Sequence, residues 1–475
     1  MMGTGMPRDA IPTADRPGPS APPATPVTSA PSATPVTSAT PVTSAPPVAP
    51  APPGRPAPAP APRPSSTPWP LSLLGTETRR SLGAAWHVTW ISRVLVWVCG
   101  AGAFAIWGNQ PQGAGFDPHG YTRGFGWFGN ALIAPAARWD TTWYTSIANE
   151  GYVHDTSRPA FFPLYPMFEA AAGFFTGSAV PGGILVSLVA MLVALTALHR
   201  LTELELGERA ARLALWAIAL FPMALFLSAV YSESLFLAFA VTSVLAARTD
   251  RWWLAGVLGG LAAGTRSAGV LLLVLLAVMF WERRAHNPPA RALWILLVLA
   301  GPGLIALWFA AQGMHPFVFS EAQHAWGRDW AGPFYGVKDG AVAAWDGVRQ
   351  LLSGQREHVY FAKAGGDPVQ VAWRNVVPFV WLLLTVPALI GVFRRLPLSY
   401  GLFTVATLAL PLSYPVPPMP LMSYGRFVLV LFPLFMWGGA WLADGGRWRP
   451  RVVLGASAAG LGVASALFAT WFWVA

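Results

Sequence analysis

The sequence predicts an all-α polytopic membrane protein with a bundle of about eleven transmembrane helices. Apolar residues make up 54% of the 475 residues, and charged residues only 11%, about half the usual share. The apolar residues also come in blocks of roughly 15–25 with almost no charge, the length that crosses about 30 Å of hydrocarbon. Composition and block length therefore both favour a chain that crosses the bilayer many times.

The candidate spans follow from these blocks. They lie at about 83–107, 181–199, 212–230, 234–248, 252–265, 267–282, 291–311, 374–393, 398–414, 426–443 and 452–474.

The orientation follows from the arginines, because short cytoplasmic loops collect Lys and Arg. With a cytoplasmic N-terminus, every predicted inside segment is basic: Arg79 and Arg80; Arg200, Arg209 and Arg212; Arg248 and Arg251; Arg283, Arg284 and Arg291; Arg394 and Arg395; Arg447, Arg449 and Arg451. The two long outer loops, about 109–180 and 312–373, balance their bases with acids. Orientation thus explains the net charge of +10, and we expect no nucleic-acid partner.

Residues 1–70 form a separate region rich in Pro, Ala, Thr and Ser, in which Thr-Pro-Val-Thr-Ser-Ala recurs at 25–30, 34–39 and 40–45. Such a composition forms no packed core, so we expect a disordered cytoplasmic tail before a membrane domain at 71–475. The single cysteine, Cys99, rules out an intramolecular disulfide and a cysteine metal site.

Residues 161–178 are apolar enough to span but carry Glu169 and begin Phe-Phe-Pro-Leu-Tyr-Pro. If this segment spanned the bilayer, every later segment would flip and the arginine pattern would invert. We therefore expect a re-entrant or interfacial helix on the outer side.

Polar residues gather on the predicted outer face. They fall into five groups: Arg138-Trp139-Asp140 with Tyr152; Tyr231-Ser232-Glu233-Ser234; Thr265-Arg266-Ser267; Gln323-His324 with Trp326 and Arg328; and Ser423-Tyr424-Gly425-Arg426. Ionisable residues at membrane depth are costly and mark candidate functional sites.

The residue types in these groups fit group transfer from a phosphate-linked carrier. Asp140 is the candidate catalytic base, and the arginines Arg266, Arg426 and Arg138 are candidates to bind the phosphate. Further candidates, either substrate-binding or structural, are Glu233, Gln323, His324, Tyr152 and Trp139. No His or carboxylate spacing resembles a metal site, and we expect no cofactor.

Structural roles remain open for the same residues. Asp140 also fits a pair with Arg138 or a cap for a helix beginning at Thr141. Glu233 fits a pair with Arg266 that holds two spans together. The arginines fit interfacial anchors, and Gln323 and His324 fit ordinary loop positions.

Four segments resemble a known family, the second mannosyltransferase of glycosylphosphatidylinositol anchor synthesis and its bacterial relatives, which are GT-C glycosyltransferases. In order, they are Arg138-Trp139-Asp140 with Ile147-Ala148, Gly151-Tyr152 and Ala160-Phe161-Phe162-Pro163-Leu164-Tyr165-Pro166; Phe221-Pro222 with Tyr231-Ser232-Glu233-Ser234-Leu235-Phe236; Thr265-Arg266-Ser267; and Met422-Ser423-Tyr424-Gly425-Arg426-Phe427.

The resemblance implies a GT-C-like bundle and inverting transfer of mannose from a polyprenyl-phosphate carrier, with Asp140 as base. The acceptor would be a hydroxyl of an extracytoplasmic glycan or lipid-linked molecule. Two departures from the family stand out: its Ser-Asn reads Ser267-Ala268, and its Pro-Arg-Tyr reads Tyr424-Gly425-Arg426. Abundant arginine with almost no lysine suggests a GC-rich bacterial genome. We therefore expect the protein in a bacterial plasma membrane. A lipid or glycolipid transporter or flippase is the alternative function.

Overall fold

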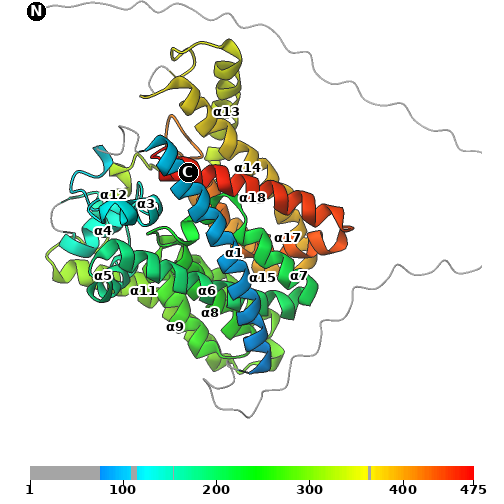
Figure 1. The fold of residues 1–475 in the computed structure, drawn as a ribbon. Coiled ribbons are helices and arrows are strands. Elements are labelled where there is room, and N and C mark those ends of the chain that lie inside the picture. The colour runs from blue at the N-terminus through cyan, green and yellow to red at the C-terminus, as the bar shows by residue number, and fades with distance from the viewer. Residues whose placement is uncertain (1–74, 109–114, 153–154, 362–364, 475) are drawn as a thin grey trace, which may run out of the picture. The chain divides into compact units, whose positions relative to one another are not determined.

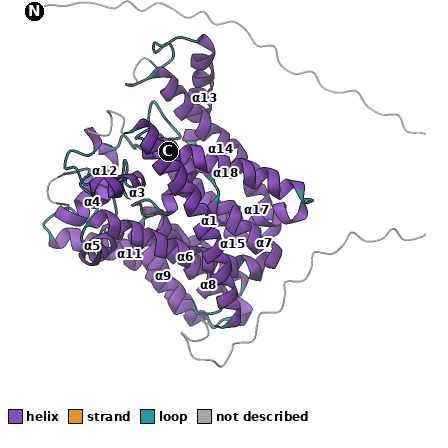
Figure 2. Ribbon diagram, in the orientation of Figure 1, coloured by secondary structure: helices purple, strands orange, loops and turns teal. Residues whose placement is uncertain are grey.

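The structure, a computed structural model, describes residues 75–108, 115–152, 155–361 and 365–474. In these ranges the chain consists mainly of helices. Within these ranges there is no strand, only one isolated antiparallel bridge between Val416 and Met419, and Figure 2 shows helices joined by loops. The all-α prediction is confirmed. The predicted tail at 1–70 lies outside the described residues.

Five described helices are long and apolar enough to cross a membrane: α1 (Thr76–Trp107), α6 (Ala179–Leu206), η7 with α11 (Pro289–Ala311), α14 (Pro368–Arg395) and α18 (Trp448–Ala469). Three further apolar helices are shorter: α9 (Trp252–Thr265), η5 with α10 (Ser267–Glu282) and α15 (Leu398–Leu412). The protein is therefore a multi-pass membrane protein, while the count of eleven spans stays a prediction.

Two predicted spans are broken. The block at 212–230 divides into α7 (Glu208–Ala219), η4 (Pro222–Leu227) and non-helical residues 228–232 before α8 (Glu233–Arg248) begins. The block at 426–443 divides into α16 (Tyr424–Leu429) and α17 (Phe432–Asp444). Pro222 and Pro433 stand directly after the two breaks, where a residue without a backbone N–H and with a fixed φ starts a new helix.

Arg93, inside the first span, stabilises one of these breaks. Its guanidinium donates hydrogen bonds to the carbonyl oxygens of Ala224 at 2.7 Å and Ala219 at 3.2 Å, and to Ser228 Oγ at 2.9 Å. Interrupted backbone at membrane depth needs partners from the protein. Arg93 is not among the candidate residues predicted from the sequence, although an arginine in the middle of an apolar block is itself a signal of a structural or functional role.

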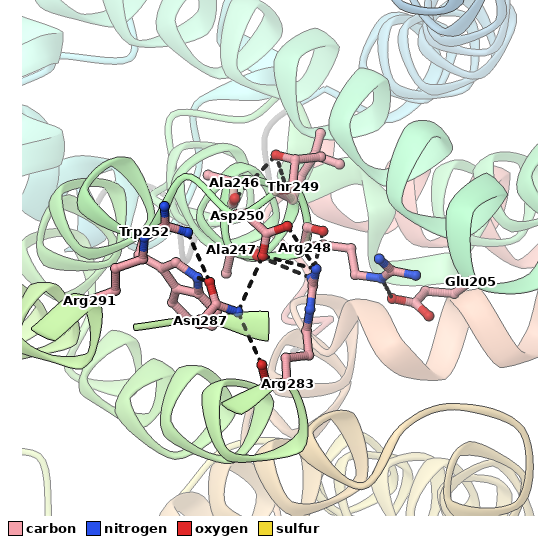
Figure 3. A network of polar contacts seen from close by, with 11 residues as sticks. Glu205, Ala246, Ala247, Arg248, Thr249, Asp250, Trp252, Arg283, Asn287 and Arg291 are labelled. Carbon is pink, nitrogen blue, oxygen red and sulfur yellow. Dashed lines mark hydrogen bonds and ion pairs between the residues drawn. The ribbon is translucent and has the colours of Figure 1, made fainter. Parts of the chain in front are cut away.

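The arginine-rich turns meet at one end of the bundle. Figure 3 shows a network, here called the turn-side network, of Glu205, Arg248, Asp250, Trp252, Arg283, Asn287 and Arg291. Other side-chain pairs join further turns and helix ends: Tyr400–Glu205, Ser399–Glu282, Glu77–Arg200 and Arg395–Asp444. The loops predicted to be cytoplasmic thus share one end, and which compartment they face stays a prediction.

Within the first long loop, α5 (Leu164–Thr176) forms a hairpin with α6. Its 13 residues rise about 20 Å, less than the roughly 30 Å of hydrocarbon. Gly177, at a φ of +85°, turns the chain back toward α6, and Phe174 and Phe175 are exposed. A short helix followed by a reversal of the chain is consistent with the predicted re-entrant or interfacial segment.

The central helix α8 positions the site. It packs against α6 and α9, in the green region of Figure 1, and nearly all of its side chains are buried. Glu233 begins this helix and Arg248 ends it beside the turn-side network. The remaining described elements are α3 (Gly126–Leu132), η2 (Ala134–Ala136), α4 (Thr141–Glu150), η3 (Arg158–Ala160), η6 (Arg284–His286), α12 (Val318–Ala325) and α13 (Tyr335–Ser353).

Candidate active site

Four charged side chains from four separate segments meet beside the start of α8. We call Asp140, Glu233, Arg266 and Arg426 the four-charge cluster. Arg426 NH1 lies 2.6 Å from Asp140 Oδ2, and Arg426 Nε and NH2 lie 2.9 Å and 2.8 Å from Glu233 Oε1. Arg266 NH1 lies 2.8 Å from the same Glu233 oxygen. A single carboxylate thus joins two arginines, and one of these reaches the second carboxylate.

Each member stands where a helix begins or is interrupted. Asp140 precedes α4 and follows Trp139, which has a φ of 55°. Glu233 is the first residue of α8, and Arg266 is extended between α9 and η5. Arg426 lies in α16, three residues after Ser423 at a φ of 64°. The cluster is therefore assembled at helix ends and interruptions.

The cluster is buried, yet one of its carboxylate oxygens remains available as an acceptor. The side chain of Glu233 is 0% exposed, that of Arg426 8% and that of Asp140 16%. Glu233 Oε2 has no hydrogen-bond partner within the described part of the chain. Charges in such surroundings interact more strongly than in water, so this cluster can respond strongly to a bound anion or a transferred proton.

Two tyrosines frame the cluster. Tyr231 OH accepts a hydrogen bond from the Asp140 backbone N–H at 3.0 Å, and the Tyr231 ring lies 4.7 Å from the Arg426 guanidinium. Tyr144 OH pairs with Ser232 Oγ at 2.9 Å, and that oxygen also accepts from Arg266 NH1 at 3.2 Å. Burial raises the pKa of Tyr144 to about 12, so its hydroxyl stays protonated at neutral pH. The motif Tyr231-Ser232-Glu233-Ser234 contains Tyr231, but the sequence alone assigned no role to this residue.

The structure agrees with some of the structural alternatives for the predicted residues and disagrees with others. The Asp140 side chain makes no capping hydrogen bond to α4 and pairs with Arg426. Glu233 does bind Arg266, as its structural alternative requires. Arg138 is 1% exposed; its Nε donates to the Ala469 carbonyl at 2.9 Å, and its guanidinium stacks on Trp471. Because that position is buried against α18, we do not retain Arg138 as a phosphate ligand.

The other predicted residues lie around the cluster rather than in it. Trp139 packs against Trp471 and Trp473, and Tyr152 OH donates to the Phe161 carbonyl at 2.6 Å. These two positions build the first loop. On α12, Gln323 accepts from Arg328 NH1 at 3.2 Å, while exposed His324 pairs with Asp329 at 2.5 Å.

A different group of possible metal ligands lies near the arginine-rich turns. One ligand atom each from His199, Glu203 and Glu208 falls within 4.8 Å of the others. Arg80 and Arg200 already contact Glu203, the latter at 2.8 Å. Because the carboxylate is neutralised by arginines, we assign no cation to this group.

Comparison with known proteins confirms the resemblance over part of the chain. Residues 127–287 match the family model described as mannosyltransferase (PIG-V). GPI alpha-1,6-mannosyltransferase 2 from Rattus norvegicus is 33% identical over 153 residues, covering 30% of this chain and 31% of that protein. The Mus musculus protein of the same name is 32% identical over 155 residues, with coverage of 30% and 31%. The match thus spans about a third of the length of these relatives.

Solved structures give more distant similarities. The Archaeoglobus fulgidus oligosaccharyltransferase in complex with Zn and sulfate has a TM-score of 0.39 at 14% identity, covering 70% of this chain and 48% of that one. ArnT from Cupriavidus metallidurans bound to undecaprenyl phosphate has a TM-score of 0.39 at 15% identity, covering 71% and 70%.

The family match contains Asp140, Glu233 and Arg266 but ends before Arg426. The assignment of Arg426 to the same site therefore depends on its contacts with Asp140 and Glu233.

Proposed function

We propose that this chain is a membrane glycosyltransferase that moves mannose from a polyprenyl-phosphate carrier to a hydroxyl of an extracytoplasmic acceptor, with inversion at the anomeric carbon. The observation that carries the proposal is the four-charge cluster, three of whose members lie in the matched residues 127–287. It combines a partly exposed carboxylate with two arginines in otherwise buried surroundings.

The proposed reaction needs a proton acceptor and a stabilised leaving group. The acceptor oxygen attacks the anomeric carbon of mannose while Asp140 takes the hydroxyl proton. The bond between that carbon and the phosphate oxygen breaks, and its electron pair stays on the departing polyprenyl phosphate. Arginine donors that face this oxygen stabilise the charge that develops there.

The geometry supports Asp140 rather than Glu233 as the base. Glu233 is fully buried, and one of its oxygens already receives hydrogen bonds from both Arg266 and Arg426. Asp140 is more exposed and binds Arg426 through Oδ2. In this assignment, Glu233 orients the two arginines, and Asp140 meets the substrate.

The test measures transfer from radiolabelled polyprenyl-phosphate mannose in native membranes that carry the wild type or Asp140→Asn. We expect a labelled product with the wild type and a loss of about 10²- to 10⁴-fold with Asp140→Asn, the usual contribution of a general base. Asp346→Asn is a matched control, because Asp346 sits on α13 in a loose pair with Arg349 at 3.4 Å. It should transfer at the wild-type rate.

Unchanged transfer by Asp140→Asn would disprove the base assignment while leaving the enzyme class intact. No product from the wild type with any of several polyprenyl-phosphate sugars, together with movement of labelled lipid across the membrane, would replace the transferase by a transporter.

A further inference from the structure

The second long loop is fixed above the first loop beside the four-charge cluster. Trp326, just after α12, donates from Nε1 to the Ser157 carbonyl at 3.2 Å. Its ring packs edge-on against Trp143 and Phe161, with centroids 5.3 Å and 5.5 Å away. Trp143 belongs to α4, which begins directly after Asp140. The loop is therefore attached to the helix that directly follows the candidate base.

A second attachment lies a few residues further on. The Ala331 backbone N–H donates to the Ser413 carbonyl at 3.0 Å, at the end of α15. That end leads through residues 414–423 to α16 and Arg426. Arg328 lies between the two attachments, so its position is set by the segments that hold Asp140 and Arg426.

Arg328 differs from the two cluster arginines in its partners. Arg266 and Arg426 both bind carboxylates, whereas the Arg328 guanidinium donates to the neutral amide oxygen of Gln323 at 3.2 Å. Burial lowers the pKa of Arg328, and the charge of Asp140 raises it. The contact of Trp326 with Trp143 of α4 brings the segment of Arg328 next to the segment of Asp140. Counted together with the four-charge cluster, Arg328 gives three arginines and two carboxylates, an excess of one positive charge.

We propose that Arg328 is the principal ligand for the phosphate of the lipid-linked donor, held ready by the Trp326 attachment. This inference rests on the proposed function and names the residue that recognises the donor. Carboxylates already neutralise Arg266 and Arg426. A phosphate therefore gains most from Arg328, which pairs with no carboxylate among the residues that the structure describes. Gln323 orients the planar guanidinium, and a fixed planar donor pair suits phosphate oxygens.

The test measures binding separately from transfer. Purified full-length protein in detergent is titrated with radiolabelled polyprenyl phosphate, using the wild type, Arg328→Gln, Arg328→Lys and a control, Arg356→Gln. Arg356 is an exposed arginine of the same loop. We expect Arg328→Gln to weaken binding by about 10- to 100-fold, as for the loss of a charged hydrogen-bond donor. Arg328→Lys should recover part of the affinity, and Arg356→Gln should match the wild type.

Steady-state transfer gives the second readout. Arg328→Gln should raise the KM for the polyprenyl-phosphate donor and leave the KM for the acceptor unchanged. Competition by uncharged polyprenol should be equal in wild type and variant, because polyprenol lacks the phosphate.

The outcomes separate this inference from the proposed function. Wild-type affinity for polyprenyl phosphate in Arg328→Gln would overturn the role of Arg328 and leave the transferase proposal standing. Equal losses of polyprenol and polyprenyl-phosphate binding would also overturn it, by indicating a general disturbance of the loop. A wild type that binds polyprenyl phosphate but transfers no sugar would contradict the proposed function alone.

Discussion

Two polar clusters lie at opposite ends of α8 and are built in different ways. At one end, the four-charge cluster joins side chains to side chains, with Glu233 receiving Arg266 and Arg426. At the other end, some 22 Å away by helix rise, the turn-side network combines side-chain pairs such as Arg248–Glu205 with donors to backbone carbonyls. Arg283 NH1 donates to the Arg248 carbonyl at 2.6 Å, and Asn287 Nδ2 donates to the Arg283 carbonyl at 3.3 Å.

This difference distinguishes a network that stabilises the fold from a cluster that can take part in chemistry. Helix ends leave carbonyl groups without intrahelical partners, and the turn-side network supplies donors to them, with Trp252 and Asn287 locked together at 2.8 Å (Figure 3). In the four-charge cluster, by contrast, Glu233 Oε2 has no hydrogen-bond partner among the described residues. A network that caps helix ends stabilises the fold, whereas buried charges with unused acceptor capacity can serve chemistry.

Among the variants that test this comparison, Glu233→Gln should destabilise the protein most. Removing this charge leaves Arg266 and Arg426 buried around a neutral amide, and we expect a loss of about 3–5 kcal/mol in unfolding free energy. Thermal unfolding of the detergent-solubilised protein measures it. The double variant Glu233→Gln with Arg266→Gln should lose less than the sum of the two single variants. Additive losses would show that the pair contributes no coupling.

Arg93→Met should cause the second-largest loss of stability. Arg93 is buried, and it donates hydrogen bonds to backbone carbonyls, as Arg283 does in the turn-side network. Its loss leaves the Ala219 and Ala224 carbonyls without this donor, which should cost about 1.5–3 kcal/mol. The same unfolding assay applies, with Arg349→Met as a surface control. A variant as stable as the control would mean that the break in the α7–η4 span needs no side-chain support.

Asp250→Asn should have a smaller effect and should leave transfer intact. Asp250 pairs with Arg283 at 3.0 Å, but its side chain is 38% exposed, so solvent screens the interaction. We expect about 0.5–1 kcal/mol and wild-type transfer activity. A loss of transfer with unchanged stability would contradict the division between a structural end and a functional end.

The smallest expected effect depends on pH and tests the first loop. A hydrogen bond from Tyr121 and then Arg158 lower the pKa of Glu150. A lowered carboxyl pKa adds stability above the unfolded value of about 4.3, and that stability disappears as pH falls through the folded value. Tyr121→Phe should therefore unfold at a lower temperature than wild type at pH 6, and the gap should shrink as the pH falls below about 4. A gap independent of pH would exclude this linkage.

The sequence predicted much of the fold because membranes constrain helices strongly. The length of the apolar blocks predicted the all-α class, and the positions of the arginines predicted that the turns between helices lie together at one end of the bundle. The interruptions were missed, although Pro222 offered a local signal. Arg93 was overlooked because its apolar block suggested a simple span, and its backbone partners only come together in the folded bundle.

The candidate site was predictable in its members but not in its pairing. The topology placed Asp140, Glu233, Arg266 and Arg426 on one face, and the structure brings them into contact. The sequence offered Arg138 as a partner or phosphate ligand, but its guanidinium packs on α18. Neighbours in sequence can point in opposite directions at an irregular backbone, as at Trp139, and only coordinates resolve that choice.

The attachment of the first loop to the last turn of α18 has a practical consequence for handling the protein. Arg138 and Trp139 are fixed by Ala469, Trp471 and Trp473, so the segment directly before Asp140 takes its position from residues more than 300 positions later. Shortening the chain within 469–473, or fusing a folded tag rigidly there, would disturb the candidate base without touching it. Affinity tags for purification and assay therefore belong at the other end of the chain.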